Sequence, residues 1–325
     1  MFKHIRTGLL TAAVFAGALL ATAPMHAADS KAPVPGSKDV IYSGDAKCTS
    51  CHDESESVPV LSIAKTKHGV AKDGRVPSCT SCHGESDAHA GKVEGKRPPT
   101  DRAYGKHSKL TAEEQSATCT SCHQSGKHMN WNTSAHATRD VSCTSCHQVH
   151  TSHDKVRDKR EQPEVCYSCH KQQRAEANKP SHHPVPEGKM TCSDCHNTHG
   201  SAGEKMLIKD TVNATCYTCH AEKRGPFVHN HQPVSDNCSN CHNPHGTTAE
   251  NLLISRQPFL CQSCHAENTH MGNVPGVREF MPNAASGTNG PGLAQARGCM
   301  NCHTNIHGSN SPSNATSAGA GRFFR

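Results

Sequence analysis

All 20 cysteines of this 325-residue chain fall in ten copies of the pentapeptide C-x-x-C-H, and no cysteine is left over. The two sulfurs and the imidazole stand at positions i, i+3 and i+4, which share one side of a single helical turn. That spacing lets both sulfurs form thioethers to the vinyl groups of a haem while the imidazole binds the iron. The sequence therefore predicts ten covalently bound haem c groups.

The motifs give two sets of predicted site residues. The thioether cysteines are Cys48, Cys51, Cys79, Cys82, Cys119, Cys122, Cys143, Cys146, Cys166, Cys169, Cys192, Cys195, Cys216, Cys219, Cys238, Cys241, Cys261, Cys264, Cys299 and Cys302. The proximal iron ligands are His52, His83, His123, His147, His170, His196, His220, His242, His265 and His303.

Three other readings of a cysteine-rich chain fit the spacing poorly. A disulfide framework gives no reason for a histidine after every second cysteine. Zinc ribbons pair two C-x-x-C knuckles around each metal ion and have no use for that histidine either. A thioredoxin-like redox motif needs one copy within an α/β pattern, and no such pattern is present.

The composition leaves too little apolar material for an ordinary core. Hydrophobic residues make up 33% of the chain, cysteines included, with one Trp, four Tyr and seven Phe. Ordering the backbone costs roughly 1 to 2 kcal/mol per residue, so another group must supply buried apolar surface. We expect a multihaem cytochrome c that is mostly coil, with short helices around an elongated stack of ten haems and little or no sheet. With 325 residues for ten motifs, neighbouring haems must nearly touch.

The first 28 residues have the pattern of an export signal. Lys3 and Arg6 precede the apolar stretch from Gly8 to Ala21, and small residues follow, with cleavage expected after Ala27 or Ala28. An uncleaved membrane anchor is the alternative, but the apolar run is short, and no other segment approaches the roughly 20 apolar residues that a membrane helix needs. We expect a soluble, exported protein.

Each iron needs a sixth ligand or keeps an open position. Fifteen histidines remain outside the signal and the motifs, and every interval after a motif contains at least one. The intervals with a single candidate contain His68, His199, His245, His270 and His307. These five are required if every haem has two histidine ligands.

An internal repeat guides the choice in the other five intervals. The motifs form five pairs, which begin at Cys48/Cys79, Cys119/Cys143, Cys166/Cys192, Cys216/Cys238 and Cys261/Cys299. After the second motif of a pair a histidine follows closely, and after the first motif it comes later. This pattern favours His89 over His107, His136 over His128, His150 over His153, His183 over His182 and His231 over His229.

A histidine three residues past a motif histidine sits on the same helical side, so it cannot reach the far face of its own porphyrin. We therefore expect such histidines to bind other haems and to brace neighbours together. Methionine is the rival ligand, with Met129, Met271 and Met300 near motifs. Methionine raises the potential, whereas the full supply of histidines favours ten low-potential haems with two histidine ligands each. We expect Trp131 to pack on a porphyrin.

Four regions follow along the chain. They are residues 1–28 (signal peptide), 29–47 (extended lead-in), 48–307 (decahaem electron-transfer domain of five di-haem repeats) and 308–325 (mobile tail). Short helices are predicted at Thr111 to Ala117, where Thr111 and Glu114 form a capping box, and at Lys171 to Ala177. Strand signals are almost absent.

The charge pattern argues against nucleic acid as a partner. The net charge is +6, and the basic residues are scattered rather than grouped. Ten haems would add about twenty propionate carboxylates, so the assembled protein should be acidic where the bare chain is basic.

Several segments carry a closer likeness. They are CHQVH ending at His150, TCSDCHNTHG at Thr191 to Gly200, CYTCHAEKRGP at Cys216 to Pro226, NCHNPHG at Asn240 to Gly246 and NCHTNIHGSN at Asn301 to Asn310. With ten motifs in this order, the chain resembles the periplasmic decahaem cytochromes of Mtr/Mto-type porin–cytochrome conduits over essentially all of its mature length.

The resemblance implies an electron carrier inside an outer-membrane β-barrel porin, with histidine on both faces of every haem. It implies electron exchange between periplasmic or inner-membrane cytochromes and an outer-surface multihaem cytochrome, extracellular iron or mineral. Relatives serve metal reduction, iron oxidation and extracellular dimethyl sulfoxide respiration, so the direction of flow stays open. Iron oxidation or metal reduction at exposed haems also stays open.

Two other functions remain as alternatives. A multihaem reductase of a small oxyanion needs one haem with an open site, often marked by lysine in place of the motif histidine, and no C-x-x-C-K occurs here. A soluble periplasmic electron shuttle would differ from the conduit only in lacking the porin.

Overall fold

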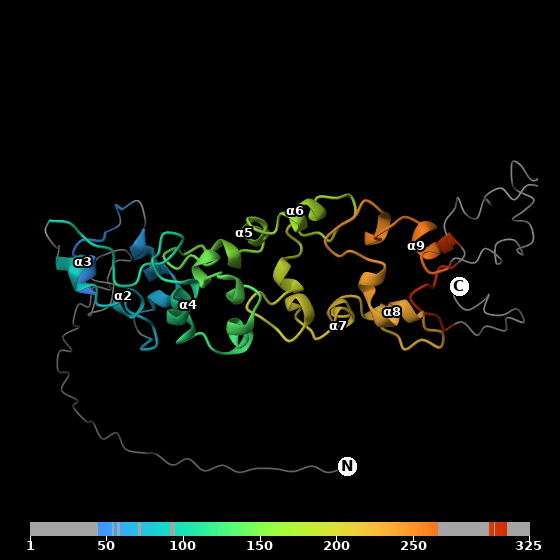
Figure 1. The fold of residues 1–325 in the computed structure, drawn as a ribbon, viewed down its shortest axis with the longest axis horizontal. Coiled ribbons are helices and arrows are strands. Elements are labelled where there is room, and N and C mark those ends of the chain that lie inside the picture. The colour runs from blue at the N-terminus through green and yellow to red at the C-terminus, as the bar shows by residue number, and fades with distance from the viewer. Residues whose placement is uncertain are drawn as a thin grey trace, which may run out of the picture.

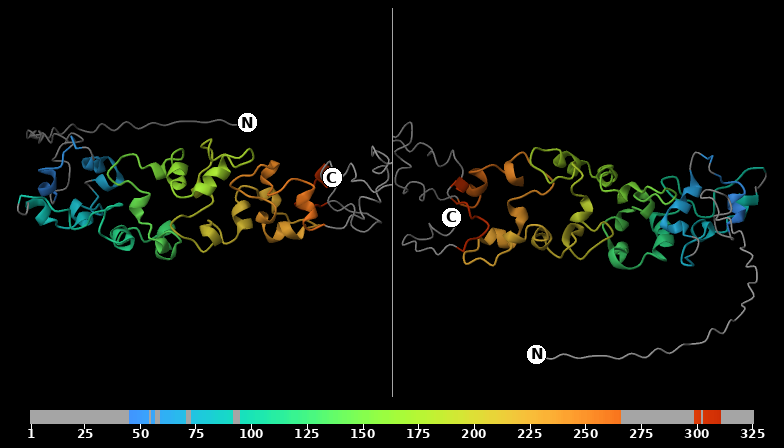
Figure 2. Two further views of the ribbon diagram at one scale, coloured as in Figure 1. Left: turned by 45° about the horizontal axis from the view of Figure 1, so that its top comes forward. Right: turned by 180° about the vertical axis from the view of Figure 1, so that it is seen from behind.

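The computed structural model describes residues 45–53, 55–56, 59–70, 73–91, 95–265, 299–301 and 303–310. The predicted signal peptide, nearly all of the lead-in and nearly all of the tail lie outside these residues, as do Cys302, His270 and Met271. The described chain is elongated, and its elements follow one another along the long axis in sequence order (Figure 1). Two further views show the same order (Figure 2).

Nine short α-helices occur among the described residues. They are α1 (Ala46–Thr49), α2 (Cys79–His83), α3 (Asp87–Gly91), α4 (Ala112–Thr120), α5 (Gln162–Tyr167), α6 (Lys171–Ala177), α7 (Val212–Cys216), α8 (Gln232–Asp236) and α9 (Phe259–Gln262). Helices α2 and α3 lie near one end, α5 and α6 in the middle, and α8 and α9 near the other end (Figure 1).

Single turns of 3₁₀-helix supply most of the remaining regular structure. They are η2 (Val60–Lys65), η3 (Lys67–Gly69), η4 (Gly126–His128), η5 (Trp131–Thr133), η6 (Ala137–Arg139), η7 (Cys143–Ser145), η8 (Lys155–Arg157), η9 (Cys192–Asp194), η10 (Glu204–Met206), η11 (Ala221–Lys223), η12 (Cys238–Asn240), η13 (Glu250–Leu252) and η15 (Cys299–Asn301). The described part of the chain contains isolated β-bridges but no strand. The prediction of coil with short helices and little or no sheet is confirmed there.

Both predicted helices are present. In α4 the Thr111 hydroxyl accepts a hydrogen bond from the Glu114 backbone N–H at 3.2 Å, and the Glu114 carboxylate accepts one from the Thr111 N–H at 2.7 Å. This is the predicted capping box, although the helix continues past Ala117 into the third motif. Helix α6 has the predicted bounds.

The paired motifs share one local architecture. The first motif of each pair begins within an α-helix, where α1, α4, α5, α7 and α9 contain its first cysteine. The second motif begins a new turn at its own first cysteine, at the start of α2, η7, η9, η12 and η15. A pair is therefore a short helix followed by a capped turn, with the connecting loop between them.

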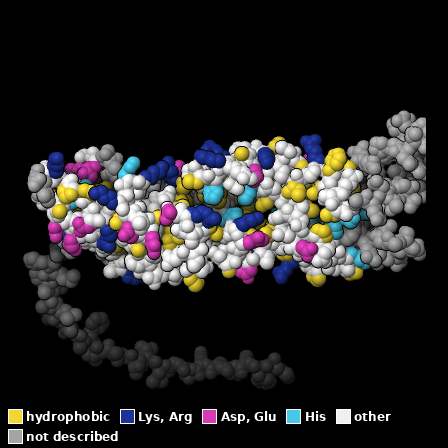
Figure 3. Space-filling view, viewed as in Figure 1, with side chains coloured by type: hydrophobic (Ala, Val, Ile, Leu, Met, Phe, Trp, Pro, Cys, Tyr) yellow, Lys and Arg dark blue, Asp and Glu magenta, His cyan; other side chains and the backbone are white. Residues whose placement is uncertain are grey.

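The protein interior contains little apolar side chain. The buried hydrophobic residues of the described chain are Leu61, Trp131, Tyr167, Ala177, Leu207 and Ala249. Acidic and basic side chains are mixed over the visible face, with histidines showing between them near its middle (Figure 3). None of the described helices has the length and apolar character to cross a membrane. The chain folds around something other than its own side chains, as its composition predicts.

Candidate haem-binding sites

Each described motif closes into the helical turn that haem attachment needs. The histidine N–H donates to the carbonyl of the first cysteine at 2.9 to 3.1 Å in nine motifs, and the Cys79–His83 motif is itself helix α2. This places the sulfurs and the imidazole of one motif on the same side of the turn.

Within each pair, the first cysteines of the two motifs lie side by side. Their thiols are hydrogen bonded to each other in the couples Cys48/Cys79, Cys119/Cys143, Cys166/Cys192, Cys216/Cys238 and Cys261/Cys299. In the haem-bearing protein both sulfurs are thioethers without a proton, so each contact marks a point where two attachment sites adjoin. The five pairs read from the sequence are thus also neighbours in space.

Between pairs, it is the second cysteines that approach one another. In each of the first four pairs, burial raises the pKa of the second thiol of the second motif, and the nearby thiol of the next pair adds to the shift. The couples are Cys82/Cys122, Cys146/Cys169, Cys195/Cys219 and Cys241/Cys264. First-cysteine and second-cysteine contacts alternate, so the series is unbroken from the first motif to the tenth. The attachment sites therefore follow one another in sequence order.

The selected histidines pair with motif histidines at one nearly constant spacing. In nine pairs the ring centres are 5.9 to 6.3 Å apart. A nitrogen ligand lies about 2 Å from its metal ion, and an imidazole nitrogen about 1 Å from its ring centre. Two imidazoles on opposite sides of one iron would therefore have centres about 6 Å apart. The observed spacing fits a haem iron between each pair.

The pairs connect different motifs. They are His52 with His89, His83 with His150, His123 with His68, His147 with His199, His170 with His136, His196 with His245, His220 with His183, His242 with His307 and His265 with His231. A selected histidine after an odd-numbered motif faces the motif two ahead. One after an even-numbered motif faces the motif two behind, and among the nine described pairs His89 departs from this rule. This geometry supports the expected cross-bracing. His270, the remaining candidate, lies outside the described residues.

Hydrogen bonds at Nδ1 orient these rings. The backbone carbonyls of Thr198 and Pro244 accept hydrogen bonds from Nδ1 of His136 and His183, at 2.9 and 2.8 Å, and the Ile306 carbonyl lies near the His231 ring. Each of these carbonyls belongs to the residue just before another selected histidine, namely His199, His245 or His307. Neighbouring ring pairs are therefore linked through a single peptide group, and Nε2 is left for the iron.

Motif histidines are oriented in the same way, with one chemical difference among them. Backbone carbonyls accept from Nδ1 of His83, His196 and His242 at 2.8 to 3.0 Å. At two motifs a carboxylate accepts instead: the Glu56 carboxylate accepts from Nδ1 of His52 at 2.9 Å, and the Asp154 carboxylate accepts from Nδ1 of His147 at 2.7 Å. A carboxylate partner makes the imidazole a stronger electron donor to iron.

Several paired rings are neutral by virtue of their surroundings. Burial lowers the pKa of His199 to about 4 and also lowers the pKa of His150, His196, His245 and His307. Neutral imidazole is the form that binds a metal ion.

Two of the histidines set aside in the sequence analysis have surface partners. The Nε2 of His153 contacts the Glu161 carboxylate, and both side chains are exposed to solvent. The Nε2 of His182 lies 3.0 Å from the Glu187 carboxylate. Neither ring faces a motif histidine, although His182 is adjacent in sequence to His183.

His128 is the rejected candidate nearest to an axial position. Its ring centre lies 4.3 Å from that of His199 and 5.6 Å from that of His123. Both distances are shorter than the spacing of the nine pairs. His107 is exposed, and the His229 backbone forms a bridge with Ser309.

Comparison with known proteins identifies the family. The chain is 44% identical over 274 residues to the multiheme cytochrome MtrA of Shewanella baltica (strain OS185), and the alignment covers 83% of this chain and 80% of that relative. The chain belongs to the MtrA-type multihaem cytochromes. The resemblance found in its sequence is thereby confirmed, and the protein is an electron-transfer cytochrome with covalently bound haem c.

Two domain families match parts of this multihaem cytochrome. The doubled CXXCH motif family matches residues 182–225 and 231–270, and the NrfB-like cytochrome c-type family matches residues 79–162. The doubled units contain the sixth with the seventh motif and the eighth with the ninth. These units group the motifs one position later than the five pairs do. Each unit therefore contains one of the contacts between second cysteines.

Sequence reasoning missed a polar residue that connects the two motifs of each pair. This residue stands three or four positions before the first cysteine of the pair. Its side-chain oxygen accepts a hydrogen bond from a residue at the start of the second motif. The distances are 2.7 to 3.2 Å. Asp45 accepts from the Cys79 N–H, Gln115 from the Thr144 hydroxyl, Gln162 from the Ser193 N–H, Asn213 from the Cys238 N–H and Gln257 from the Met300 N–H. We call these five the clasp residues. The sequence signal that could have identified them is a side chain with an acceptor oxygen, three or four residues before the first cysteine, in all five pairs.

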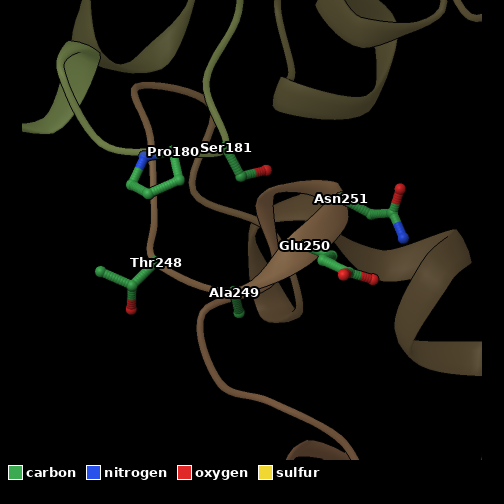
Figure 4. A pocket seen from close by; sticks show the side chains of 6 residues that line it. All are labelled: Pro180, Ser181, Thr248, Ala249, Glu250 and Asn251. Carbon is green, nitrogen blue, oxygen red and sulfur yellow. The ribbon is translucent and has the colours of Figure 1, made fainter.

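A shallow surface cavity of about 340 Å³ lies apart from the motifs (Figure 4). It is lined by Pro180, Ser181, Thr248, Ala249, Glu250 and Asn251. Glu250 is its one ionisable lining residue, and its lining contains no histidine or cysteine.

Proposed function

We propose that this cytochrome carries ten haems in a single file and conducts electrons across the outer membrane inside a β-barrel porin. The observation that carries the proposal is the unbroken series of neighbouring cysteines from the first motif to the tenth. Because the molecule is elongated along the same direction, electrons that move between adjacent sites travel from one end to the other (Figure 1). We place the protein in the periplasm, associated with the outer membrane.

The proposed site draws four side chains from the protein for every haem. Two thioether cysteines and a proximal histidine come from one motif, and a distal histidine comes from the interval after another motif. The 5.9 to 6.3 Å ring spacing supports the distal assignments at nine motifs. His270, which lies outside the described residues, is proposed as the tenth distal ligand because its interval contains no other histidine. Iron held by two histidines exchanges electrons without binding substrate, which weighs against the oxyanion reductase.

The proposed partners follow from the surface and from the family. Charged side chains are scattered over the visible face (Figure 3), so contact with lipid would be costly without a surrounding protein. A porin would supply that shield. At the two ends we propose periplasmic or inner-membrane cytochromes on one side, and an outer-surface multihaem cytochrome, iron or mineral on the other.

Haem counting tests the site. The mature protein is expected to exceed its polypeptide mass by ten haem groups, and Cys166→Ala with Cys169→Ala is expected to remove one of them. Intact-mass spectrometry of the denatured proteins gives both numbers, because thioethers survive denaturation. Exchange of Ser168 for alanine in the same motif should leave the mass gain at ten. A gain of nine or fewer in the native sequence would contradict the proposed count.

Vesicles test the conduit. A complex of the cytochrome with its candidate porin, inserted into liposomes that enclose a reduced viologen, is expected to pass electrons to an oxidant outside. Vesicles with porin alone should retain the reduced dye, and the variant without the fifth haem should behave like them because the series is interrupted at its middle. Recovery of the cytochrome only as a free periplasmic monomer, from cells that contain the porin, would favour the soluble shuttle instead.

A further inference from the structure

The five clasp residues occupy equivalent positions but do not have the same charge. Four of them, Gln115, Gln162, Asn213 and Gln257, end in neutral amides, whereas the first, Asp45, is a carboxylate. At every pair the position supplies an oxygen that accepts a hydrogen bond, and the amides of Gln115, Gln162 and Asn213 also donate to backbone carbonyls. The structural role therefore gives no reason for a charge at the first motif pair.

Asp45 is also the most enclosed of the five. Its side chain is fully buried, with a relative exposure of 0%. One carboxylate oxygen accepts the hydrogen bond from the Cys79 N–H at 2.9 Å. The other oxygen has no hydrogen-bond partner among the described residues. The charge is thus poorly screened by solvent and only half satisfied by its local contacts.

The carboxylate lies between the first two attachment sites. An oxygen of Asp45 and the sulfurs of Cys48 and Cys79 all lie within 4.8 Å of one another. In the haem-bearing protein these two sulfurs are bonded to two different macrocycles. The single charge is therefore close to both haems of the first pair, and no other pair has a charged clasp residue.

None of the described cations forms an ion pair with Asp45, although Arg97 donates to the Cys51 sulfur of the first motif at 3.5 Å. Lys47 points away and binds the exposed carboxylates of Glu85 and Asp87, at 2.8 and 3.1 Å. Arg102 lies beside the second motif and donates to the carbonyls of Thr80 and Ser81. Its positive charge opposes Asp45 at Cys82 but not at the first motif.

A second carboxylate acts in the same direction on the first haem. Glu56 accepts from the Nδ1 of His52, the proximal ligand of that haem, at 2.9 Å. Two negative groups therefore converge at this end of the molecule.

We propose that Asp45 holds the reduction potentials of the first haem pair below those of the pairs with neutral clasp residues. Reduction adds one electron to each ferric haem, and a fixed negative charge in a poorly solvated position disfavours that added electron. No proton or other reactant takes part in this effect. An electron on the first pair is then less stable than on the second, which drives it along the series toward the later motifs. This inference rests on the proposed single file of haems.

Two reciprocal substitutions test the inference. In Asp45→Asn the carboxylate becomes the isosteric amide that the fourth pair already has, so the Cys79 N–H keeps its acceptor. Asn213→Asp adds a carboxylate at the fourth pair, where it also removes the Asn213 Nδ2 donors to the Val234 and Ser235 carbonyls. Optical titration of the purified full-length cytochrome with dithionite, in the presence of redox mediators, gives the fraction reduced at each potential. Visible spectra and haem counts confirm that each variant retains its low-spin haems.

In Asp45→Asn the amplitude of two haems is expected to move from the low-potential end of the titration to higher potential. In Asn213→Asp the amplitude of two haems should move to lower potential. Unchanged curves in both variants, or shifts of the same sign, would overturn the proposal. If Asp45→Asn fails to assemble, Asn213→Asp decides alone. The measurement needs no porin, so it is separable from the vesicle test of the conduit.

Discussion

Replacing His245 by alanine is expected to open the haem of the sixth motif, although His245 follows the eighth motif in the sequence. Its ring centre lies 6.2 Å from that of His196 at an interplanar angle of 15°, whereas His242 faces His307. Loss of one imidazole leaves a five-coordinate ferric iron, which is high-spin and binds small ligands. One haem of the proposed ten should therefore change from a low-spin to a high-spin signal in electron paramagnetic resonance spectra.

His182→Ala is the matched control, because that ring contacts Glu187 and faces no motif histidine. It should leave all haems low-spin. The identity of the opened haem follows from combining His245→Ala with removal of one attachment motif. Without Cys192 and Cys195 the high-spin signal should vanish, and without Cys238 and Cys241 it should persist. The reverse result would assign His245 to its own motif and contradict the cross-bracing.

The attachment sites were predictable because their chemistry is local. Two sulfurs and an imidazole on one helical turn need only five consecutive residues, and the His N–H to Cys C=O hydrogen bonds confirm that turn in nine motifs, with the second motif forming α2. Helix α4 was predictable for a similar reason, since the Thr111 and Glu114 capping box is complete within four residues.

The choice among surplus histidines depended on the repeat rather than on single residues. Spacing after the motif separated His183 from the adjacent His182, and the structure places only His183 opposite a motif histidine, His220. Spacing could not give the identity of that partner. Selected histidines alternate between facing a later motif and facing an earlier one. This alternation arises from how successive pairs pack, which involves residues far apart in the chain. His89 shows the limit, because it departs from the alternation at the end of the series, where no earlier pair exists.

The clasp residues could not be predicted from the sequence, for a different reason. A glutamine or asparagine before a motif is ordinarily a surface residue, and its meaning depends on contacts 25 to 43 residues away, as in Asn213 with Cys238 and Gln257 with Met300. The composition argument succeeded at the level of the whole chain. The low hydrophobic content predicted a small apolar core, and few hydrophobic side chains are buried among the described residues.

Gly246→Ala is expected to lower the stability of the protein strongly. Gly200 and Gly246 each end a CHxxHG segment, and of the two we expect the larger loss at Gly246. Gly246 has φ of +142°, a conformation that side chains other than glycine's rarely adopt. A Cβ atom there would lie 2.1 Å from the backbone carbonyl oxygen of Glu176, which is too close for any contact. The strained backbone alone costs about 1 to 3 kcal/mol, and the displaced carbonyl adds to that.

The clash also reaches the haem site, because Gly246 directly follows His245 and because the Glu176 carboxylate lies 3.5 Å from the His245 ring. We expect the free energy of unfolding to fall by about 3 kcal/mol in guanidinium titrations followed by the haem absorption band. Gly126→Ala is the control, since Gly126 has φ of +61° but nothing within 4 Å of an added Cβ. It should lose only about 1 to 2 kcal/mol, the cost of the left-handed backbone. Equal losses in the two variants would show that Glu176 moves aside freely, and that the close approach of α6 to the eighth motif does not hold His245 in place.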